Sequence, residues 1–295
     1  MKLANLTNLA LHSACLATVA ACGSDPTTEG GVGKAKFTTW GEAYIEDGIP
    51  ADPEGEAGFV DGWDLRYDKF LVNFHGITVA DADGNVGAKA SKSYFVDNTK
   101  PNRKQLIVFS DLEAKAWEAV SYQIKPAEAK AVVISGDAED LAMMVGAGYS
   151  IYVEGSATKE SVTKTFHWGF TTATQYEGCH HEEEGKDTLG IVVTNGSTDT
   201  SELTTHGDHF FYDRLQESPD PKIKTRLRFD EKAAADDGGN ADGEITLQEM
   251  SELPIDITKY NPSGLHAPSI GAFVMSLART VGHFRGEGEC KVSEL

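Results

Sequence analysis

The sequence predicts a mainly β protein. We expect an antiparallel β-sandwich over residues 35–215 and, packed on it, a C-terminal helical extension over 216–295 that contains an EF-hand-like loop. Two observations lead to this prediction. Before residue 207, short runs in which apolar and polar residues alternate are separated by Gly, Asn, Asp and Pro, as in half-buried strands joined by turns. From residue 208 onward, the apolar spacing becomes that of amphipathic helices.

The individual elements follow from this patterning. The clearest strand pattern covers 63–79, and residues 81–85 combine Asp, Gly and Asn as a hairpin turn does. A short helix is expected at 137–146, with Asp137 as its N-cap and Gly146 at its end. We expect further strands at 35–45, 92–97, 105–109, 117–124, 130–135, 149–155, 162–170, 188–194 and 202–206, and later helices at 208–216, 228–235, 246–252 and 268–282.

The N-terminus has the layout of a secretory signal. One basic residue, Lys2, precedes a modestly apolar run, and Val19-Ala-Ala stands directly before Cys22. This arrangement resembles the lipobox of bacterial lipoproteins, in which the cysteine is acylated and becomes the new N-terminus. We therefore expect residues 1–21 to be a lipoprotein signal peptide, Cys22 to carry lipid, and residues 22–34 to form a flexible tether. The alternative is a plain secretory signal with an incidental cysteine.

The acidic composition limits the partners. The formal net charge is −20 at pH 7 and is spread along the chain. We therefore expect no nucleic-acid partner, and instead metal ions or a basic protein. No apolar run reaches the roughly 18–20 residues of a spanning helix, so membrane attachment is expected through the lipid. Gly23, in place of Asp after the lipidated cysteine, resembles outer-membrane sorting signals and predicts an anchored position in the cell envelope, facing the periplasm or the exterior.

The cysteines predict one disulfide bond. Of four cysteines, Cys15 lies in the signal and Cys22 takes the lipid, so Cys179 and Cys290 remain in an oxidising compartment. We predict that these two are bonded to each other. A metal site with two thiolates is the alternative.

Residues 236–249 look like an EF-hand calcium loop. Oxygen-bearing residues alternate before the turn glycine Gly243, and a glutamate closes the loop. Counting back from Gly243 places the first ligand at Gly238, so Asp237 or Asp236 must reach in across an insertion, or the loop has lost a ligand. The alternative is a solvated acidic turn between helices. The predicted calcium ligands are Asp237, Asn240, Asp242, Glu244 and Glu249.

The histidines suggest a transition-metal site. His206 and His209 form a His-x-x-His pair where a strand ends and a helix begins, with Asp208 between them as a ligand or hydrogen-bond acceptor. Two imidazoles do not complete a site, so we expect His283 or His167 to supply the third. The bond to Cys290 gives a reason for His283 to come near. For each histidine alone, an ordinary surface or core role is the alternative.

Three stretches support a family resemblance. Residues 63–81, 148–155 and 206–211 resemble uncharacterised lipoproteins of environmental bacteria and, more loosely, the periplasmic copper-binding β-sandwich proteins associated with methanobactin systems. The resemblance implies a calcium-stiffened β-sandwich that handles a metal, copper above all. Only His206 and His209 carry the metal-binding role over.

Catalytic motifs are poorly supported. The sequence contains no Gly-x-Ser-x-Gly, no phosphate-binding loop and no His-Glu-x-x-His, so we expect no enzyme. We predict a lipid-anchored metal-binding protein of the cell envelope, taking copper or zinc, with a structural calcium loop. The alternative is a non-catalytic structural or interaction lipoprotein of the envelope that binds a protein or carbohydrate partner.

Overall fold

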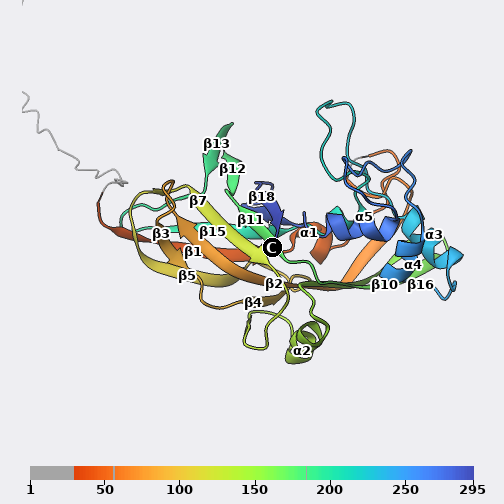
Figure 1. Cartoon of the computed structure of the whole chain (residues 1–295), viewed down its shortest axis with the longest axis horizontal. Helices are drawn as coiled ribbons and strands as arrows, with labels where there is room; N and C mark the ends of the chain where they lie inside the picture. The colour runs from red at the N-terminus through yellow and green to blue at the C-terminus, as the bar shows by residue number, and fades with distance from the viewer. Residues whose placement is uncertain (1–29, 56, 184) are drawn as a thin grey trace, which may run out of the picture.

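Strands dominate the computed structural model, which describes residues 30–55, 57–183 and 185–295 (Figure 1). The mainly β prediction is confirmed. The helices are α1 (Glu42–Glu46), α2 (Ala138–Ala147), α3 (Asp230–Gly238), α4 (Leu247–Glu252), α5 (Ile270–Leu277) and the 3-10 helix η1 (Asp208–Phe211). The strands are β1 (Val32–Trp40), β2 (Asp64–Ala80), β3 (Val86–Lys89), β4 (Tyr94–Asp97), β5 (Lys104–Glu113), β6 (Ala116–Trp117), β7 (Ala119–Ile124), β8 (Val132–Val133), β9 (Ile151–Lys159), β10 (Val162–Phe170), β11 (Thr174–Glu177), β12 (His180–Glu183), β13 (Lys186–Leu189), β14 (Ile191–Val192), β15 (Thr198–Thr205), β16 (Glu244–Ile245), β17 (Gly282–Phe284) and β18 (Lys291–Glu294).

Two large sheets share one apolar core. The smaller sheet has the order β17-β15-β1-β5, and the larger sheet follows the path β16-β10-β9-β2-β7-β11-β18 with β3, β4 and β8 attached. Phe37 of β1 and Leu203 of β15 belong to the same buried cluster as Phe74 of β2 and Tyr122 of β7. Because alternate residues of a strand face one side, the alternation that the sequence shows from Trp63 onward places one row of side chains in this core.

The sheets are mixed rather than antiparallel, which corrects the expected arrangement. Most pairs are antiparallel, but β1 runs parallel to β15, β4 to β8, and β10 to β16. The sequence signal for a strand is its alternation, and alternation is the same in either direction. The pattern therefore does not predict the direction of a strand. The parallel pair β1–β15 positions the candidate site described below.

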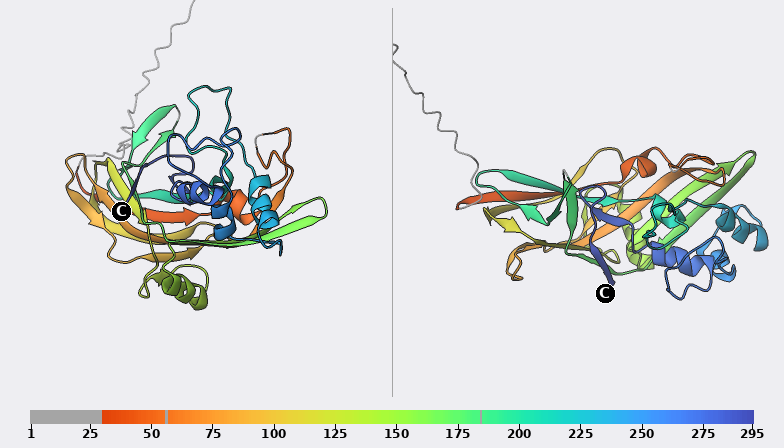
Figure 2. Two further views of the ribbon diagram at one scale, coloured as in Figure 1. Left: turned by 45° about the vertical axis from the view of Figure 1, so that its right-hand side comes forward. Right: turned by 90° about the horizontal axis from the view of Figure 1, so that it is seen from above.

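Helix α2 covers the outer face of the larger sheet. Leu141 and Met144 of α2 pack on Leu71 of β2 and Phe95 of β4 in a second, smaller cluster. Figures 1 and 2 show α2 on the side of the sheet opposite α5. Its predicted N-cap is confirmed, because the Asp137 side chain accepts a hydrogen bond from the Asp140 N–H.

Residues 216–295, expected as a helical extension packed on the sandwich, also contribute strands to both large sheets. Strand β16 adds to the larger sheet beside β10, β18 adds to it beside β11, and β17 adds to the smaller sheet beside β15. These strands have two to four residues, too few for their alternation to stand out in the sequence. Helices α3, α4 and α5 lie among them at one end of the molecule (Figure 1).

Two element boundaries also differ from expectation near the site. Strand β1 begins at Val32, inside the expected tether, and ends at Trp40, after which α1 replaces the expected continuation. The expected helix at 208–216 shortens to η1, because the following residues make sheet-like contacts: Tyr212 bridges Leu227, and the Asp213 N–H donates to the Arg226 carbonyl.

Candidate metal centre

The ends of three neighbouring strands bring the site together. Because β1 and β15 are parallel and Trp40 is paired with Thr204, the residues that follow them emerge at the same edge of the sheet. These residues include Glu42 after β1 and His206 after β15. Strand β17 runs antiparallel to β15 and pairs His283 with Thr204. Residues far apart in the sequence therefore meet at one sheet edge.

Three imidazoles form a compact cluster there. Helix η1 follows β15 directly and carries His209 back over His206, with ring centroids 5.2 Å apart. The His283 ring lies 4.2 Å from His206 and 5.0 Å from His209. The structure thus brings together three of the four predicted ligands.

Carboxylates accompany the histidines. Among the described residues, two groups of three side chains have potential ligand atoms within 4.8 Å of one another: His206 with Asp208 and His209, and His206 with His283 and Glu287. Both groups lie in this cluster and share His206. Zinc, copper and similar ions accept this combination of imidazole nitrogen and carboxylate oxygen.

Burial keeps the imidazoles neutral. It lowers the pKa of His206 to about 4, and it lowers the pKa of His283, which the neighbouring His206 depresses further, also to about 4. The pKa of His209 falls well below its usual range for the same reasons. Neutral imidazoles have a free lone pair, which is the form that binds a metal.

The buried carboxyl groups shift in the opposite direction. Burial, helped by the nearby charges of Glu287, Asp208 and Glu202, raises the pKa of Glu42 to about 8. Burial also raises the pKa of Asp208 to about 6. Glu42 Oε1 lies 3.1 Å from His206 Nε2, and the backbone of Glu42 has a φ of 57°, a left-handed conformation that costs a non-glycine residue about 1–3 kcal/mol.

Two buried polar atoms in the cluster have no hydrogen-bond partner among the described residues. They are Asp208 Oδ1 and His283 Nδ1. The other oxygen of Asp208 accepts a hydrogen bond from the Tyr212 hydroxyl at 2.9 Å. A buried polar atom without a partner costs about 1–3 kcal/mol, so such an atom points to a missing partner.

Thr280 fixes the tautomer of His209. The Thr280 hydroxyl donates its single hydrogen to the Leu277 carbonyl at 2.9 Å, so its oxygen must accept from His209 Nδ1, 2.8 Å away. The proton of His209 therefore sits on Nδ1, and Nε2 is free to bind a metal. A ligand histidine is usually oriented by a hydrogen bond of this kind.

A cleft of about 660 Å³ opens beside the cluster. His209, Tyr212, His283 and Glu287 line it, together with the glutamates Glu217 and Glu289 and one basic residue, Arg214. The cleft therefore carries more acidic than basic side chains, which favours the approach of cations.

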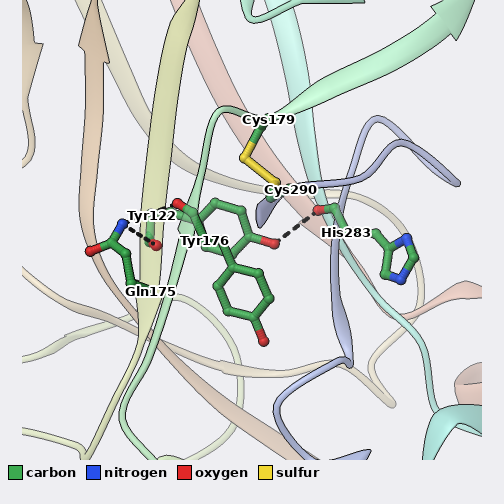
Figure 3. The surroundings of a disulfide bond; sticks show 6 residues. All are labelled: Tyr122, Gln175, Tyr176, Cys179, His283 and Cys290. Carbon is green, nitrogen blue, oxygen red and sulfur yellow. Dashed lines mark hydrogen bonds between the residues drawn. A yellow bond between two sulfur atoms is a disulfide. The ribbon is translucent and has the colours of Figure 1, made fainter. Parts of the chain in front are cut away.

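The predicted disulfide bond is confirmed and borders the same cleft. Cys179 and Cys290 are bonded, and Cys290 lines the cleft. Beside the bond, the rings of Tyr122 and Tyr176 stack with centroids 4.6 Å apart, and the Tyr122 hydroxyl donates to the carbonyl of His283 (Figure 3). Figure 3 also shows the His283 imidazole directed away from this stack. The backbone that carries His283 is thus tied to β7.

His167 does not join the cluster. It lies on β10, where its Nδ1 is 3.2 Å from Glu244 and its Nε2 is 3.8 Å from Glu154. Its side chain is 42% exposed. The structure therefore favours His283 over His167 as the companion of the pair.

The predicted calcium loop connects α3 to α4, but its carboxylates do not converge. Asp237 and the buried Asp236 both bind the ammonium group of Lys164, and Asp236 also accepts from the Gly243 N–H. Lys164 precedes the residues of β10 that pair with β16. The other predicted ligands make local contacts: Asn240 with Asp242, Asp242 with the Glu244 N–H, and Glu249 with Thr246 in a capping box.

The predicted signal peptide, the lipidated Cys22 and the first part of the tether lie outside the described residues. In the part of the chain that the structure describes, no helix has both the length and the hydropathy needed to cross a bilayer.

Sequence reasoning missed Glu42 and Glu287. Glu42 falls in a segment expected to continue a strand, and only the parallel pairing of β1 with β15 places it beside His206. Glu287 lies near His283 in an acidic stretch, where the sequence does not distinguish a ligand glutamate from its acidic neighbours. The short spacing between His283 and Glu287 was the one available signal.

Comparisons with known proteins add little to this geometry. Neither a scan of protein-family models nor a search of curated proteins finds a match. A solved structure with some likeness is MbnP from Methylosinus trichosporium, with 11% sequence identity over 61% of this chain and 77% of that one, and a TM-score of 0.30. This likeness is loose, and identity at this level establishes no shared function.

Proposed function

We propose that this protein binds one transition metal ion, copper or zinc, in the cell envelope at the cluster formed by His206, His209 and His283. One observation carries the proposal: three mostly buried, neutral imidazoles from two segments of the chain converge, and a buried aspartate lies beside two of them. Asp208 Oδ1 and His283 Nδ1 have no partner among the described residues. A cation bound to Asp208 or to His283 would supply the missing partner and offset the cost of burying that atom.

Ligand chemistry supports copper or zinc over calcium or magnesium at this cluster. Imidazole nitrogen suits copper and zinc, whereas calcium and magnesium prefer oxygen ligands alone. For a mixed site of nitrogen and oxygen, copper(II) has the highest intrinsic affinity among the divalent first-row metals. Asp208 would serve as a carboxylate ligand, since it is buried and lies in the same group as His206 and His209.

The anchor and the β-sandwich scaffold are part of the proposal. The lipobox-like sequence before Cys22 supports acylation and attachment to the outer membrane. A Cys22→Ser variant should then lose the lipid and leave the membrane fraction. If this variant stays with membranes after a high-salt wash, the lipobox interpretation is wrong.

A structural calcium ion in residues 236–249 remains a second proposal. The loop carries five predicted oxygen ligands between two helices. Calcium would have to displace the Lys164 ammonium from Asp236 and Asp237, so we expect weak binding.

We propose a binding role and no catalysis. A structural or interaction lipoprotein that binds a protein or carbohydrate is the alternative, and it predicts no metal at the histidine cluster. The deciding experiment is elemental analysis and calorimetric titration of protein purified without a histidine tag.

Wild-type protein should bind about one copper or zinc ion per chain, and His206→Ala should abolish that binding because His206 belongs to both ligand groups. His167→Ala is the matched control: it removes a histidine outside the cluster and should leave the stoichiometry unchanged. Absence of a bound metal in wild type, or equal losses in the two variants, would favour the alternative.

A further inference from the structure

The cluster contains two overlapping sets of possible ligands. One set is His206, Asp208 and His209, and the other is His206, His283 and Glu287. We call them the inner group and the outer group. Each set has three side chains whose ligand atoms lie within 4.8 Å of one another, and His206 is the member that they share.

The two groups differ in their access to solvent. Every member of the inner group is buried, with His206 at 3%, Asp208 at 7% and His209 at 7% exposure. In the outer group, His283 is half-buried and Glu287 is exposed. Both of these line the cleft, whereas of the inner group only His209 lines it and neither His206 nor Asp208 does. A cation that arrives through the cleft can therefore reach two members of the outer group, one of them exposed, but only one buried member of the inner group.

We propose that the metal ion is captured by the outer group and then passes to the inner group, with His206 as the common ligand. The inference rests on the proposed metal site and adds a route to it. Glu287 supplies a carboxylate where the ion still keeps part of its water shell. Asp208 supplies a carboxylate where water is excluded, so the attraction between ion and ligand is stronger there.

The charges along the cleft fit this order. The cleft is lined by three acidic residues, Glu217, Glu287 and Glu289, and by one basic residue, Arg214. A cleft of one predominant sign raises the local concentration of the opposite ion and speeds association. A general attraction of this kind would act equally through any of the glutamates. The proposal instead assigns a specific contact to Glu287, because Glu287 alone of the three belongs to a ligand group.

Stopped-flow measurement with Co²⁺ separates these roles, because cobalt bound to imidazole and carboxylate can be followed by its absorbance. Association is measured by mixing full-length protein with Co²⁺, and dissociation by a chase with excess chelator. Glu287→Gln should slow both association and dissociation by on the order of tenfold and leave the dissociation constant nearly unchanged. Loss of a residue that acts only on the path lowers the association rate and the dissociation rate by the same factor.

Two further variants define the alternatives. Glu289→Gln removes the same charge from the same cleft and should keep both rates within about twofold of wild type. Asp208→Asn should leave association near the wild-type rate and speed dissociation by about tenfold or more, because it weakens only the inner position. If circular dichroism shows that Asp208→Asn is unfolded, His209→Gln replaces it in this test.

Three results would overturn the inference. Equal effects of Glu287→Gln and Glu289→Gln would leave only general steering. Faster dissociation with an unchanged association rate in Glu287→Gln would make Glu287 a ligand of the final site. Absence of Co²⁺ binding by wild type would remove the route and the proposed site together, whereas the first two results leave the proposed site standing.

Discussion

Glu42 offers a sharp test of the electrostatic description of the cluster. Its carboxyl group is 15% exposed, lies 3.1 Å from His206 Nε2, and has a pKa raised to about 8 by burial and by the neighbouring acids. Metal-free protein should therefore hold Glu42 protonated at neutral pH. Glutamine has nearly the same shape as protonated glutamate and cannot ionise, so Glu42→Gln isolates the effect of the charge.

The sign and size of the effect follow from linkage. Glu42 has its ordinary pKa of 4.5 in the unfolded chain and a pKa of about 8 when folded. Because the folded pKa is raised, its stabilising contribution is fully present below pH 4.5 and is lost as the pH rises through about 8. At about 1.4 kcal/mol per pH unit, the upper limit is about 5 kcal/mol. Residual exposure reduces this to about 3 kcal/mol.

Urea denaturation at pH 5 and pH 8 in the presence of a chelator measures this difference. The wild-type free energy of unfolding should fall relative to that of Glu42→Gln by about 2 kcal/mol between these two pH values, because Glu42 is only half ionised at pH 8. The histidines titrate in both proteins and cancel in the comparison. Glu46→Gln, on the same helix, is the control and should follow wild type. Parallel pH profiles for wild type and Glu42→Gln would refute the account of the buried cluster.

Three further predictions concern the bridge, the orienting threonine and the acidic loop. Replacing Cys179 and Cys290 by serine should lower the free energy of unfolding by up to about 4–5 kcal/mol, because the bond spans 111 residues; a loss under about 1 kcal/mol in urea denaturation contradicts this. Thr280→Val should weaken metal affinity about 10–100-fold by calorimetry, because His209 loses the acceptor that fixes its tautomer, while Thr280→Ser should retain it. Equal affinity of the valine variant would exclude that role. Millimolar calcium should raise the wild-type melting temperature, and Glu249→Gln should abolish the rise; a wild-type melting curve that calcium does not change leaves the acidic-turn alternative.

Local patterns in the sequence predicted the local features well. The alternation from Trp63 onward marks a real strand, and Asp137 caps a real helix. The pairing of Cys179 with Cys290 followed from counting cysteines in an oxidising compartment. The His206–His209 pair followed from its spacing at the end of a strand. Each of these predictions depends either on residues that are close in sequence or, for the disulfide bond, on excluding the other two cysteines.

Features that depend on strand direction and pairing could not be predicted from the sequence. Glu42 and His206 meet because β1 and β15 are parallel, and alternation carries no direction. The choice of His283 over His167 depends on a three-residue strand, β17, that is too short to be recognised. The contact of Lys164 with Asp236 arises because β10 runs beside the loop, which no local pattern indicates.

The most direct test of the metal centre is a crystal structure of zinc-soaked protein with anomalous data collected at the zinc absorption edge. The account predicts one strong anomalous peak about 2.0–2.1 Å from imidazole nitrogens of His206 and His209. A carboxylate oxygen of Asp208, or His283, should complete the coordination. Absence of a peak at this cluster under saturating zinc, or a peak held by other residues alone, would contradict the central claim.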